Sequence, residues 1–391
     1  MPVRSVKKDI FSVGSIHWDR RIFDELIPLP DGTSYNAYLI KGSEKTAMID
    51  SVDPEKWTEL EMNLCELGIK KIDYIITHHA EQDHSGSIPM LLKKFPEAVV
   101  VTNDKCKAFE IDLLHIAEEK FMVIKDNETL SLGNKTLRFL MTPWVHWPET
   151  MVTYLEEDKI LFSCDFFGSH YAGSDLYAGE NPIVVHGAKR YYAEIMMPFR
   201  TTVAKNVDKV TAYDIKMIAP SHGPIYDKPE IIIDAYRDWT SDKVKKEVLI
   251  PYVSMHGSTK IMAEYLTGRL IKKGFSVKMF NLPVTDIGEL AMSLVDASTI
   301  IIGSPIVLAG AHPAAVYSAF LANALRPKAK FVSIFGSYGW GGKMVDQLAG
   351  LIPNLKVEII EPVLVKGLPR AEDFKKLDQM IESLEEKHKS L

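Results

Sequence analysis

The chain has 391 residues, more than one hydrophobic core usually serves, so its length predicts two domains. Hydrophobic residues make up 46% of the sequence and charged residues 25%, as in ordinary globular proteins. The net charge of -6 provides none of the basic excess that nucleic-acid-binding proteins show, so no nucleic-acid partner is expected.

One uncharged stretch, residues 297–325, is long enough to cross a bilayer. Prolines and glycines interrupt it, which favours a buried strand, a loop and a helix start over a membrane span. The first residues lack the apolar segment of a secretion signal. The three cysteines are far apart, which argues against disulfides, a rubredoxin-type iron site or an iron–sulfur cluster within the chain. A reducing cytoplasm is the expected location.

Residues 1–245 mix strands and helices without a simple βαβ repeat. Short apolar runs predict strands at residues 38–40, 47–49, 72–76, 98–102, 129–132 and 137–141. Helical patterns are expected at residues 55–67, 88–95 and 230–239. This mixture favours an α/β layer architecture, with sheet on sheet and helices outside. The last of these helices should close the first domain.

Three histidines and two carboxylates follow the apolar run at residues 72–76. They lie in the loop Thr77-His78-His79-Ala80-Glu81-Gln82-Asp83-His84-Ser85-Gly86. Imidazole and carboxylate groups side by side suit zinc, iron or manganese better than a thiolate-bound ion or calcium. The loop therefore predicts part of a transition-metal site.

Three later residues can complete this site: His146, Asp165 and His222. Each lies at or just after an apolar, strand-like run, where loops at one edge of a scaffold can converge. Any one of them alone would more simply be an ordinary loop residue. All three in order after the first cluster favour a shared site, in which Asp165 could bridge two ions.

From residue 246 onward, strands and helices alternate with short links. The strands are expected at residues 248–253, 276–280, 299–302, 330–334 and 357–360, and the helices at residues 258–273, 287–295, 314–325, 343–351 and 372–386. Such alternation predicts a parallel, doubly wound sheet in flavodoxin-like order. The predicted domains are therefore residues 1–245 and 246–391.

The first turn of the second domain is Ser254-Met255-His256-Gly257-Ser258-Thr259. Small hydroxyl residues and glycine at a helix N-terminus expose N–H groups that suit a phosphate. The turn matches neither G-x-G-x-x-G nor the P-loop motif, which favours a monophosphate over a dinucleotide or a nucleoside triphosphate. Taken alone, it would more simply be a helix cap without a ligand.

Two further stretches, both predicted to be loops, change that balance, because they follow the third and fourth predicted strands at the same edge of the sheet. They are Gly303-Ser304-Pro305-Ile306-Val307 and Gly336-Ser337-Tyr338-Gly339-Trp340-Gly341-Gly342. Ligands of open α/β sheets bind outside the carboxyl ends of the strands. Glycines beside aromatic residues also let a flat ring approach the backbone.

Both motif sets together resemble the flavodiiron proteins, a branch of the metallo-β-lactamase superfamily. Hydrolases of that superfamily carry H-x-H-x-D-H, whereas Glu81 makes the motif H-x-E-x-D-H here, the mark of this branch. The resemblance implies a metallo-β-lactamase-like αββα sandwich followed by a flavodoxin-like sheet that binds FMN. Two departures stand out: His256 replaces a larger aromatic, and the apolar residues 306–308 replace Thr and Asn.

The resemblance also implies roles for individual side chains. One iron would be bound by His79, Glu81, His146 and Asp165, and the other by Asp83, Asp165 and His222. His84 stays open, since it binds the second metal in the wider superfamily but could instead turn away and leave solvent in its place. His78 is expected to point away from the metals, and His170 to support a metal ligand by a hydrogen bond.

The activity that the resemblance implies is reduction of dioxygen to water, of nitric oxide to nitrous oxide, or both. Electrons from an external, rubredoxin-like carrier would pass through FMN to the two irons. One alternative is a di-zinc hydrolase whose flavodoxin-like half docks partners, and Glu81 argues against it. The other alternative, a pure electron carrier with a degenerate metal domain, conflicts with the complete ligand set.

The link at residues 241–247 is short and offers no evident way to fold the flavin edge onto the metal edge of the same chain. Electrons must nevertheless pass between them. A head-to-tail homodimer, with a tetramer as a further pairing, would place each flavin against the partner's irons. The sequence leaves open the preferred gas, the identity of the electron donor, and the choice between dimer and tetramer.

Overall fold

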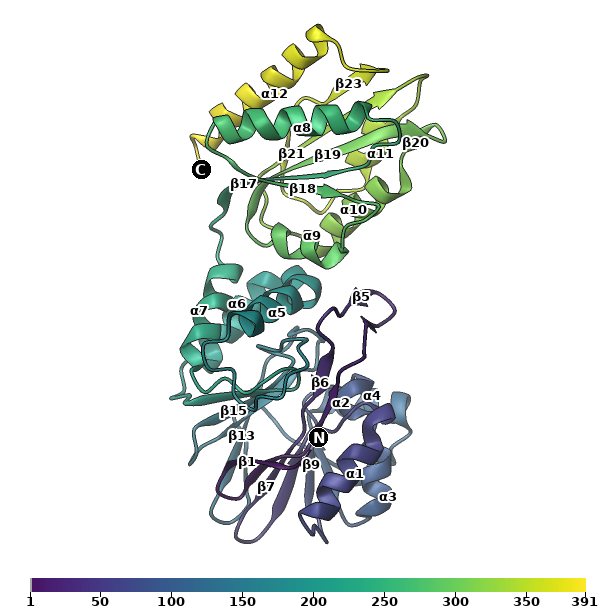
Figure 1. The fold of residues 1–391 in the computed structure, drawn as a ribbon. Helices are drawn as coiled ribbons and strands as arrows, with labels where there is room; N and C mark the ends of the chain where they lie inside the picture. Colours follow the sequence, from purple (N-terminus) through teal and green to yellow (C-terminus); the bar gives the residue numbers. More distant parts are fainter. Residues whose placement is uncertain (1) are drawn as a thin grey trace. The chain divides into compact units, whose positions relative to one another are not determined.

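The computed structural model describes residues 2–391, and these form two compact units (Figure 1). The first unit comprises the chain up to Tyr192 together with Phe199–Thr240, and the second comprises Ala193–Pro198 together with Ser241–Leu391. Among the described residues, no helix combines the length and the apolar character that crossing a bilayer requires.

The first unit is built on a pair of packed sheets. One sheet runs in the order β1 (Arg4–Lys7), β2 (Ile10–Ser12), β7 (Tyr38–Lys41), β8 (Thr46–Ile49), β9 (Tyr74–Ile76), β10 (Val99–Thr102) and β11 (Phe121–Val123). The other runs in the order β12 (Thr129–Ser131), β13 (Thr136–Met141), β14 (Met151–Leu155), β15 (Ile160–Cys164) and β16 (Met217–Pro220). Small ribbons pair β3 (Ser15–His17) with β6 (Thr33–Tyr35), and β4 (Ile22–Phe23) with β5 (Ile27–Pro28).

Apolar side chains from both sheets form one core, in which Ile49 and Ile76 of the first sheet meet Phe139 and Phe162 of the second. Helices cover the outside (Figure 1). On one side lie α1 (Trp57–Glu66), α2 (Gln82–Ser85), α3 (Ile88–Lys94) and α4 (Asp104–Leu114), and on another lie α5 (Pro182–Tyr191), α6 (Arg200–Val210) and α7 (Pro229–Thr240). Short helical turns occur at Pro54–Lys56, Glu118–Lys120, Tyr192–Met196 and Met197–Phe199. The predicted sandwich of sheet on sheet with helices outside is confirmed.

No helix is predicted at residues 104–114, yet α4 forms there. The buried residues of α4 are Cys106 and Glu110. Because Glu110 is an ionisable residue at a buried position, the sequence lacks the regular spacing of apolar residues that predicts a helix. The start of α4 does have a recognisable N-cap residue, Asn103, whose side chain accepts a hydrogen bond from the backbone N–H of Cys106 at 3.1 Å.

The second unit is a parallel sheet with helices on both faces (Figure 1). The strands run in the order β18 (Ser276–Asn281), β17 (Lys245–Tyr252), β19 (Ala297–Val307) and β21 (Phe331–Tyr338), and β21 then pairs with both β22 (Glu358–Ile359) and β23 (Val363–Lys366). Helices α8 (Ser258–Lys272) and α12 (Ala371–His388) cover one face, and α9 (Ile287–Leu294), α10 (Pro313–Leu325) and α11 (Met344–Gly350) the other. The predicted doubly wound sheet in flavodoxin-like order is confirmed. Because β17 begins at Lys245, its first residue precedes the boundary predicted at residue 246.

The prediction that residues 303–307 form a loop is wrong. Strand β19 continues through Val307 and turns back into β20 (Gly310–Ala311), so the intervening Leu308 and Ala309 form a two-residue hairpin turn. Strand β21 likewise continues to Tyr338, because β23, which is not among the predicted strands, supplies its backbone partners. Both segments still reach the carboxyl edge of the sheet, but as strands.

Candidate functional site

The metal loop begins where β9 ends, and backbone contacts with β10 hold it there. Thr77 N–H donates to the carbonyl of Val101 at 3.0 Å, and Thr102 donates back to the carbonyl of Thr77 at 2.8 Å. His78 turns into the interior, where Nδ1 lies 2.7 Å from Asp50 and Nε2 lies 2.7 Å from the hydroxyl of Thr153. It therefore contributes to the fold and points away from the other two histidines of the loop.

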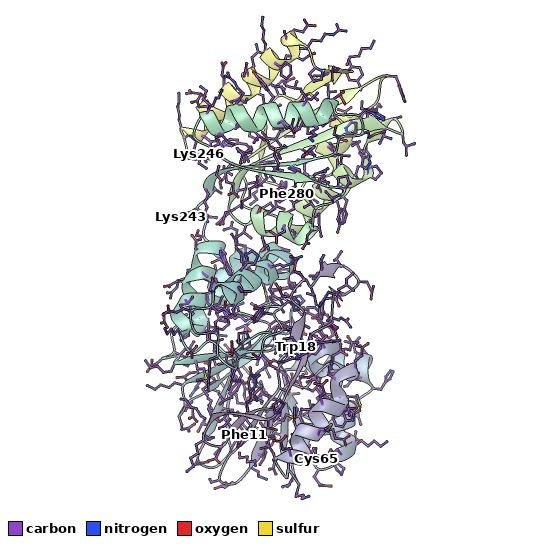
Figure 2. All side chains as sticks on the ribbon, in the orientation of Figure 1. Phe11, Trp18, Cys65, Lys243, Lys246 and Phe280 are labelled. Atoms are coloured by element: carbon purple, nitrogen blue, oxygen red, sulfur yellow. The ribbon has the colours of Figure 1, made fainter. Side chains whose placement is uncertain are left out.

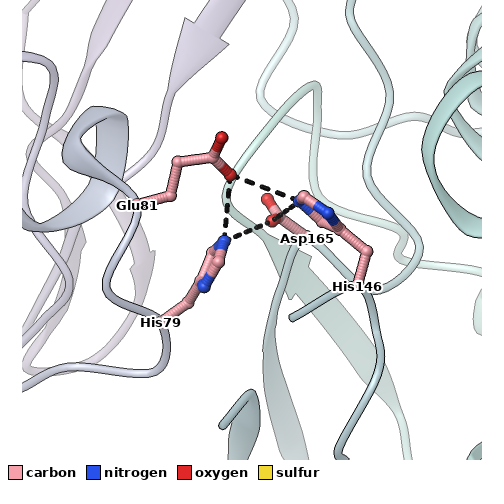
Figure 3. A group of neighbouring side chains, drawn as sticks. All are labelled: His79, Glu81, His146 and Asp165. Atoms are coloured by element: carbon pink, nitrogen blue, oxygen red, sulfur yellow. Dashed lines mark hydrogen bonds and ion pairs between the residues drawn. The ribbon is translucent and has the colours of Figure 1, made fainter. Parts of the chain in front are cut away.

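Four side chains from three loops converge at a first point (Figure 3). His79 Nε2 lies 3.0 Å from Glu81 Oε2 and 3.3 Å from Asp165 Oδ2. His146 Nε2 lies 3.2 Å and 3.3 Å from the same two oxygens. One ligand atom from each of the four lies within 4.8 Å of the others, a spacing that one metal ion can bridge.

A second group forms beside the first from Asp83, His84 and His222. His222 Nε2 lies 3.2 Å from Asp83 Oδ2 and 3.5 Å from Asp165 Oδ1. His84 Nε2 lies 2.8 Å from the same Asp165 oxygen, so its ring faces this group. The two oxygens of Asp165 therefore face different groups, Oδ2 the first and Oδ1 the second.

The donor atoms fit two cations. Both carboxylate oxygens of Asp83 and of Asp165 are buried and have no hydrogen-bond partner within residues 2–391. Burying a carboxylate without a partner is costly unless a cation lies beside it. Glu81 adds a further carboxylate where a hydrolase would have imidazole, which makes the first group harder and favours iron over zinc.

The groups hold protons when no metal is bound. Burial lowers the pKa of His222, but the neighbouring carboxylates of Asp165 and Asp83 outweigh burial and raise it to about 10. Burial raises the pKa of Asp165, but the charge of His84 and the neighbouring rings of His146 and His222 hold it well below its usual range. Metal binding must therefore displace protons from the histidines.

In the second unit, the turn at residues 254–259 leads into α8. Gly257 has φ 93°, which favours glycine, and no side chain caps the helix from that position. Ser254 Oγ accepts hydrogen bonds from the N–H groups of Gly257 at 3.2 Å and of Lys260 at 3.1 Å. Ser254 thus fixes the turn at the start of a long helix, and a helix N-terminus is a position that suits an anion.

The three predicted segments of the second unit meet at this edge. The hydroxyls of Thr259 and Ser337 lie 3.3 Å apart. A side chain at Gly336 would lie 2.0 Å from the carbonyl oxygen of Ser304, so glycine permits the close approach of β21 to β19. Ser304 itself is fully buried and donates to the carbonyl of Pro305, so its hydroxyl faces the interior. The large apolar side chains exposed on these segments are Met255, Leu308 and Trp340.

Comparison with known proteins agrees with both halves of this geometry. Residues 33–223 match the ODP family beta lactamase model, and residues 250–377 match flavodoxin. The chain is 35% identical to the nitric oxide reductase of Moorella thermoacetica over 95% of each chain, and 34% identical to the coenzyme F420H(2) oxidase of Methanothermobacter marburgensis over 91% of each. The solved rubredoxin oxygen:oxidoreductase of Desulfovibrio gigas superposes with a TM-score of 0.94, at 30% identity and 99% coverage of both chains.

The chain belongs to the flavodiiron protein family. Its first unit is metallo-β-lactamase-like and its second is flavodoxin-like, as the sequence motifs predicted. It is therefore a member of an oxidoreductase family, and each half carries a candidate site.

In this flavodiiron protein, neighbouring side chains orient the histidines of the two groups. His222 Nδ1 lies 2.7 Å from the carbonyl oxygen of Ser34 and 3.3 Å from the hydroxyl of Thr33. His170 Nδ1 lies 2.9 Å from the same hydroxyl, and burial keeps the pKa of His170 well below its usual value. His170 thus supports His222 indirectly, through Thr33. His79 Nδ1 lies 2.9 Å from Glu149, a residue that no motif marks.

Other residues beside the flavodiiron groups also escape sequence motifs. Tyr191 of α5 is buried, with its ring 4.7 Å from that of His170 and 5.6 Å from that of His222. Phe23 of β4 lies 5.2 Å from the His170 ring. Its neighbour Asp24 lies beside Glu81, and burial raises the pKa of Asp24 to about 6. Only the topology brings α5 and the β4–β5 ribbon here, since neither carries a recognisable ligand spacing.

Glu110 is a further buried carboxyl in this region of the flavodiiron fold, on α4. Burial raises its pKa from the ordinary 4.5 to about 8, and the charges of Asp50 and Glu149 add to that shift. Between pH 4.5 and pH 8, the unfolded chain therefore ionises while the folded chain keeps its proton. The free energy of unfolding should fall as the pH rises through this window.

Replacing Glu110 with glutamine should remove that dependence, because the amide resembles the neutral acid. The stability advantage of Glu110→Gln over wild type should grow by on the order of 3 kcal/mol between pH 5 and pH 8. Denaturant unfolding of both proteins at the two pH values measures it. Equal advantages at both values would show that Glu110 ionises normally in the folded chain.

Proposed function

We propose that this protein reduces dioxygen to water or nitric oxide to nitrous oxide, or both, at a non-haem di-iron site. The observation that carries the proposal is the position of Asp165 between the two histidine groups. One of its carboxylate oxygens faces the first group and the other faces the second. When bound, the irons would supply electrons and an open coordination position for a small gas. The chain would bind the metals and exclude bulk water from them, since the side chains of the second group are almost fully buried.

The ligands would divide between the two positions. The first would take His79, Glu81, His146 and Asp165, and the second Asp83, Asp165 and His222. We include His84 in the second set, because its Nε2 is directed at Asp165 and close to Asp83. Tyr191 and Phe23 would line the approach to this second position, where their rings lie beside His222.

The external donor would be a rubredoxin-like carrier that reduces FMN on the second unit. Support comes from the relative named rubredoxin oxygen:oxidoreductase. The relative named coenzyme F420H(2) oxidase supports a different donor, coenzyme F420H(2). Stopped-flow reduction of the bound flavin by each donor, under identical conditions, would distinguish the two.

The flavin itself should be FMN, near one per chain, because the turn at residues 254–259 suits a single phosphate. Heat-denatured protein should release FMN, which chromatography separates from FAD. The variant Gly257→Asp should lose the flavin, since its carboxylate would repel the phosphate and any side chain strains the positive φ of Gly257. Release of FAD, or tight retention of FMN by the variant, would contradict this prediction.

We propose a head-to-tail homodimer as the active assembly, with each flavin facing the partner's irons. The first unit exposes Trp18 (Figure 2), Ile22 and Leu26 on and beside the β4–β5 ribbon, whose Phe23 reaches the metal groups. The flavin edge of the second unit exposes Met255, Leu308 and Trp340. Two apolar surfaces, each next to one cofactor site, suit pairing with a second copy of the chain.

Steady-state turnover of the iron-loaded, FMN-loaded protein with each gas, under the same reductant, tests the proposed activity. Consumption of dioxygen or nitric oxide at rates well above those of the metal-free protein is expected. Elemental analysis distinguishes the proposed di-iron reductase from the alternative, a di-zinc hydrolase. Stoichiometric zinc, with hydrolysis but no gas reduction, would overturn the proposal.

A further inference from the structure

The loop between β13 and β14 supplies more than the ligand His146. Three residues later, Glu149 points back to the metal loop, where Oε1 accepts hydrogen bonds from His79 Nδ1 at 2.9 Å and from the N–H of Ala80 at 3.2 Å. The Glu149 side chain has no solvent exposure. Its backbone carbonyl accepts a hydrogen bond from the Asn103 side chain at 2.6 Å, so the residue is held at both ends.

The histidines of the second group have weaker supports. The acceptor 2.7 Å from His222 Nδ1 is the neutral carbonyl of Ser34. Nδ1 of His84 is buried and has no hydrogen-bond partner within residues 2–391. Among these three rings, only His79 has its outer nitrogen against a carboxylate.

We propose that Glu149 is a positioning residue that makes the first metal position, which His79 shares with Glu81, His146 and Asp165, the tighter of the two. This inference rests on the proposed di-iron site. A carboxylate at Nδ1 holds the proton on that nitrogen, which leaves the lone pair of Nε2 free for the metal and makes the ring a stronger donor. A carbonyl orients a ring in the same way but adds no charge.

The variant Glu149→Gln separates charge from shape. The amide has nearly the same volume, and its oxygen can still accept hydrogen bonds from His79 and Ala80. Only the negative charge is lost. Glu110→Gln is the control for replacing a buried carboxyl group in this region with an amide, because Glu110 is also buried but belongs to neither metal group.

Both variants and wild type are loaded with ⁵⁷Fe and exposed to an iron chelator, and release is followed by absorbance. In Glu149→Gln, one iron per chain should leave about 10–100-fold faster than in wild type, while the other leaves at the wild-type rate. Mössbauer spectra should show a change at one iron only. Glu110→Gln should release both irons at wild-type rates.

Equal acceleration of both irons in Glu149→Gln would overturn the inference, as would unchanged release. If Glu149→Gln does not fold, Glu149→Asp provides the test, since it keeps the charge but shortens its reach. Faster release of one iron supports the inference, and equal effects on both overturn it. Failure of wild type to bind two irons is a separate result, because it would refute the proposed di-iron site itself.

Discussion

Asp165→Ala should empty both metal positions at once and lower gas reduction by at least about 100-fold. The reason is geometric, since the two oxygens of Asp165 face different histidine groups at distances of 2.8 to 3.5 Å. Removing the side chain therefore takes a ligand from each position. Elemental analysis after iron loading should find almost no iron, while FMN content stays at the wild-type value.

The matched variant is His222→Ala, which removes a ligand that faces only the second position. It should keep close to one iron per chain. Asp165→Ala protein that retains one iron as tightly as His222→Ala would show that the carboxylate serves a single position. Thermal unfolding of both variants would establish that lost iron does not reflect a lost fold.

Two inactive chains should restore activity to one another. His79→Ala removes a ligand of the first metal position and Gly257→Asp removes the flavin, so each homodimer lacks one working cofactor site. In a head-to-tail heterodimer, the intact flavin of one chain faces the intact irons of the other. Random mixing makes half of the dimers heterodimers, each with one of two sites working, so about a quarter of wild-type turnover should return.

Separate affinity tags on the two chains allow the heterodimer to be isolated before turnover is measured. Its FMN content should be about half that of wild type, and its iron content about three quarters, because His79→Ala removes a ligand from one metal position only. A mixture of two His79→Ala preparations is the control, and it should stay inactive. An inactive heterodimer that carries both cofactors would show that electrons do not cross between chains.

The metal ligands could be predicted from sequence because each lies after a strand, and the strands concerned end at the same edge of the two packed sheets. The order and spacing of Glu81, His146 and Asp165 along the chain are enough to assign them to one metal site. Glu149 and Tyr191 could not be found in this way. Glu149 matters through one hydrogen bond to His79, and Tyr191 lies on a helix, α5, that only the tertiary fold brings to His170 and His222. No periodicity or motif encodes such neighbours.

At the proposed flavin site of the second unit, the sequence predicted loops where the structure has strands. Glycines and prolines at residues 303–305 and 336–342 predict loops, but β19 and β21 continue because neighbouring strands satisfy their backbone groups. Ser304 consequently faces the interior, although its segment was predicted to contact the flavin. Turn-forming residues report local preference, whereas strand length depends on a partner far along the chain.

The hairpin turn between β19 and β20 is unusual in composition. Leu308 and Ala309 both have positive φ, 52° and 61°, in a two-residue turn where Asn-Gly is the favoured pair. Each costs roughly 1 kcal/mol relative to glycine in that conformation. Leu308 nevertheless has 90% of its surface exposed, so burial of its side chain does not offset this cost in the isolated chain. The turn is therefore less stable than an Asn-Gly turn would be. Replacing Leu308 and Ala309 with Asn-Gly should raise the melting temperature of the protein but remove an exposed apolar side chain from the proposed dimer surface.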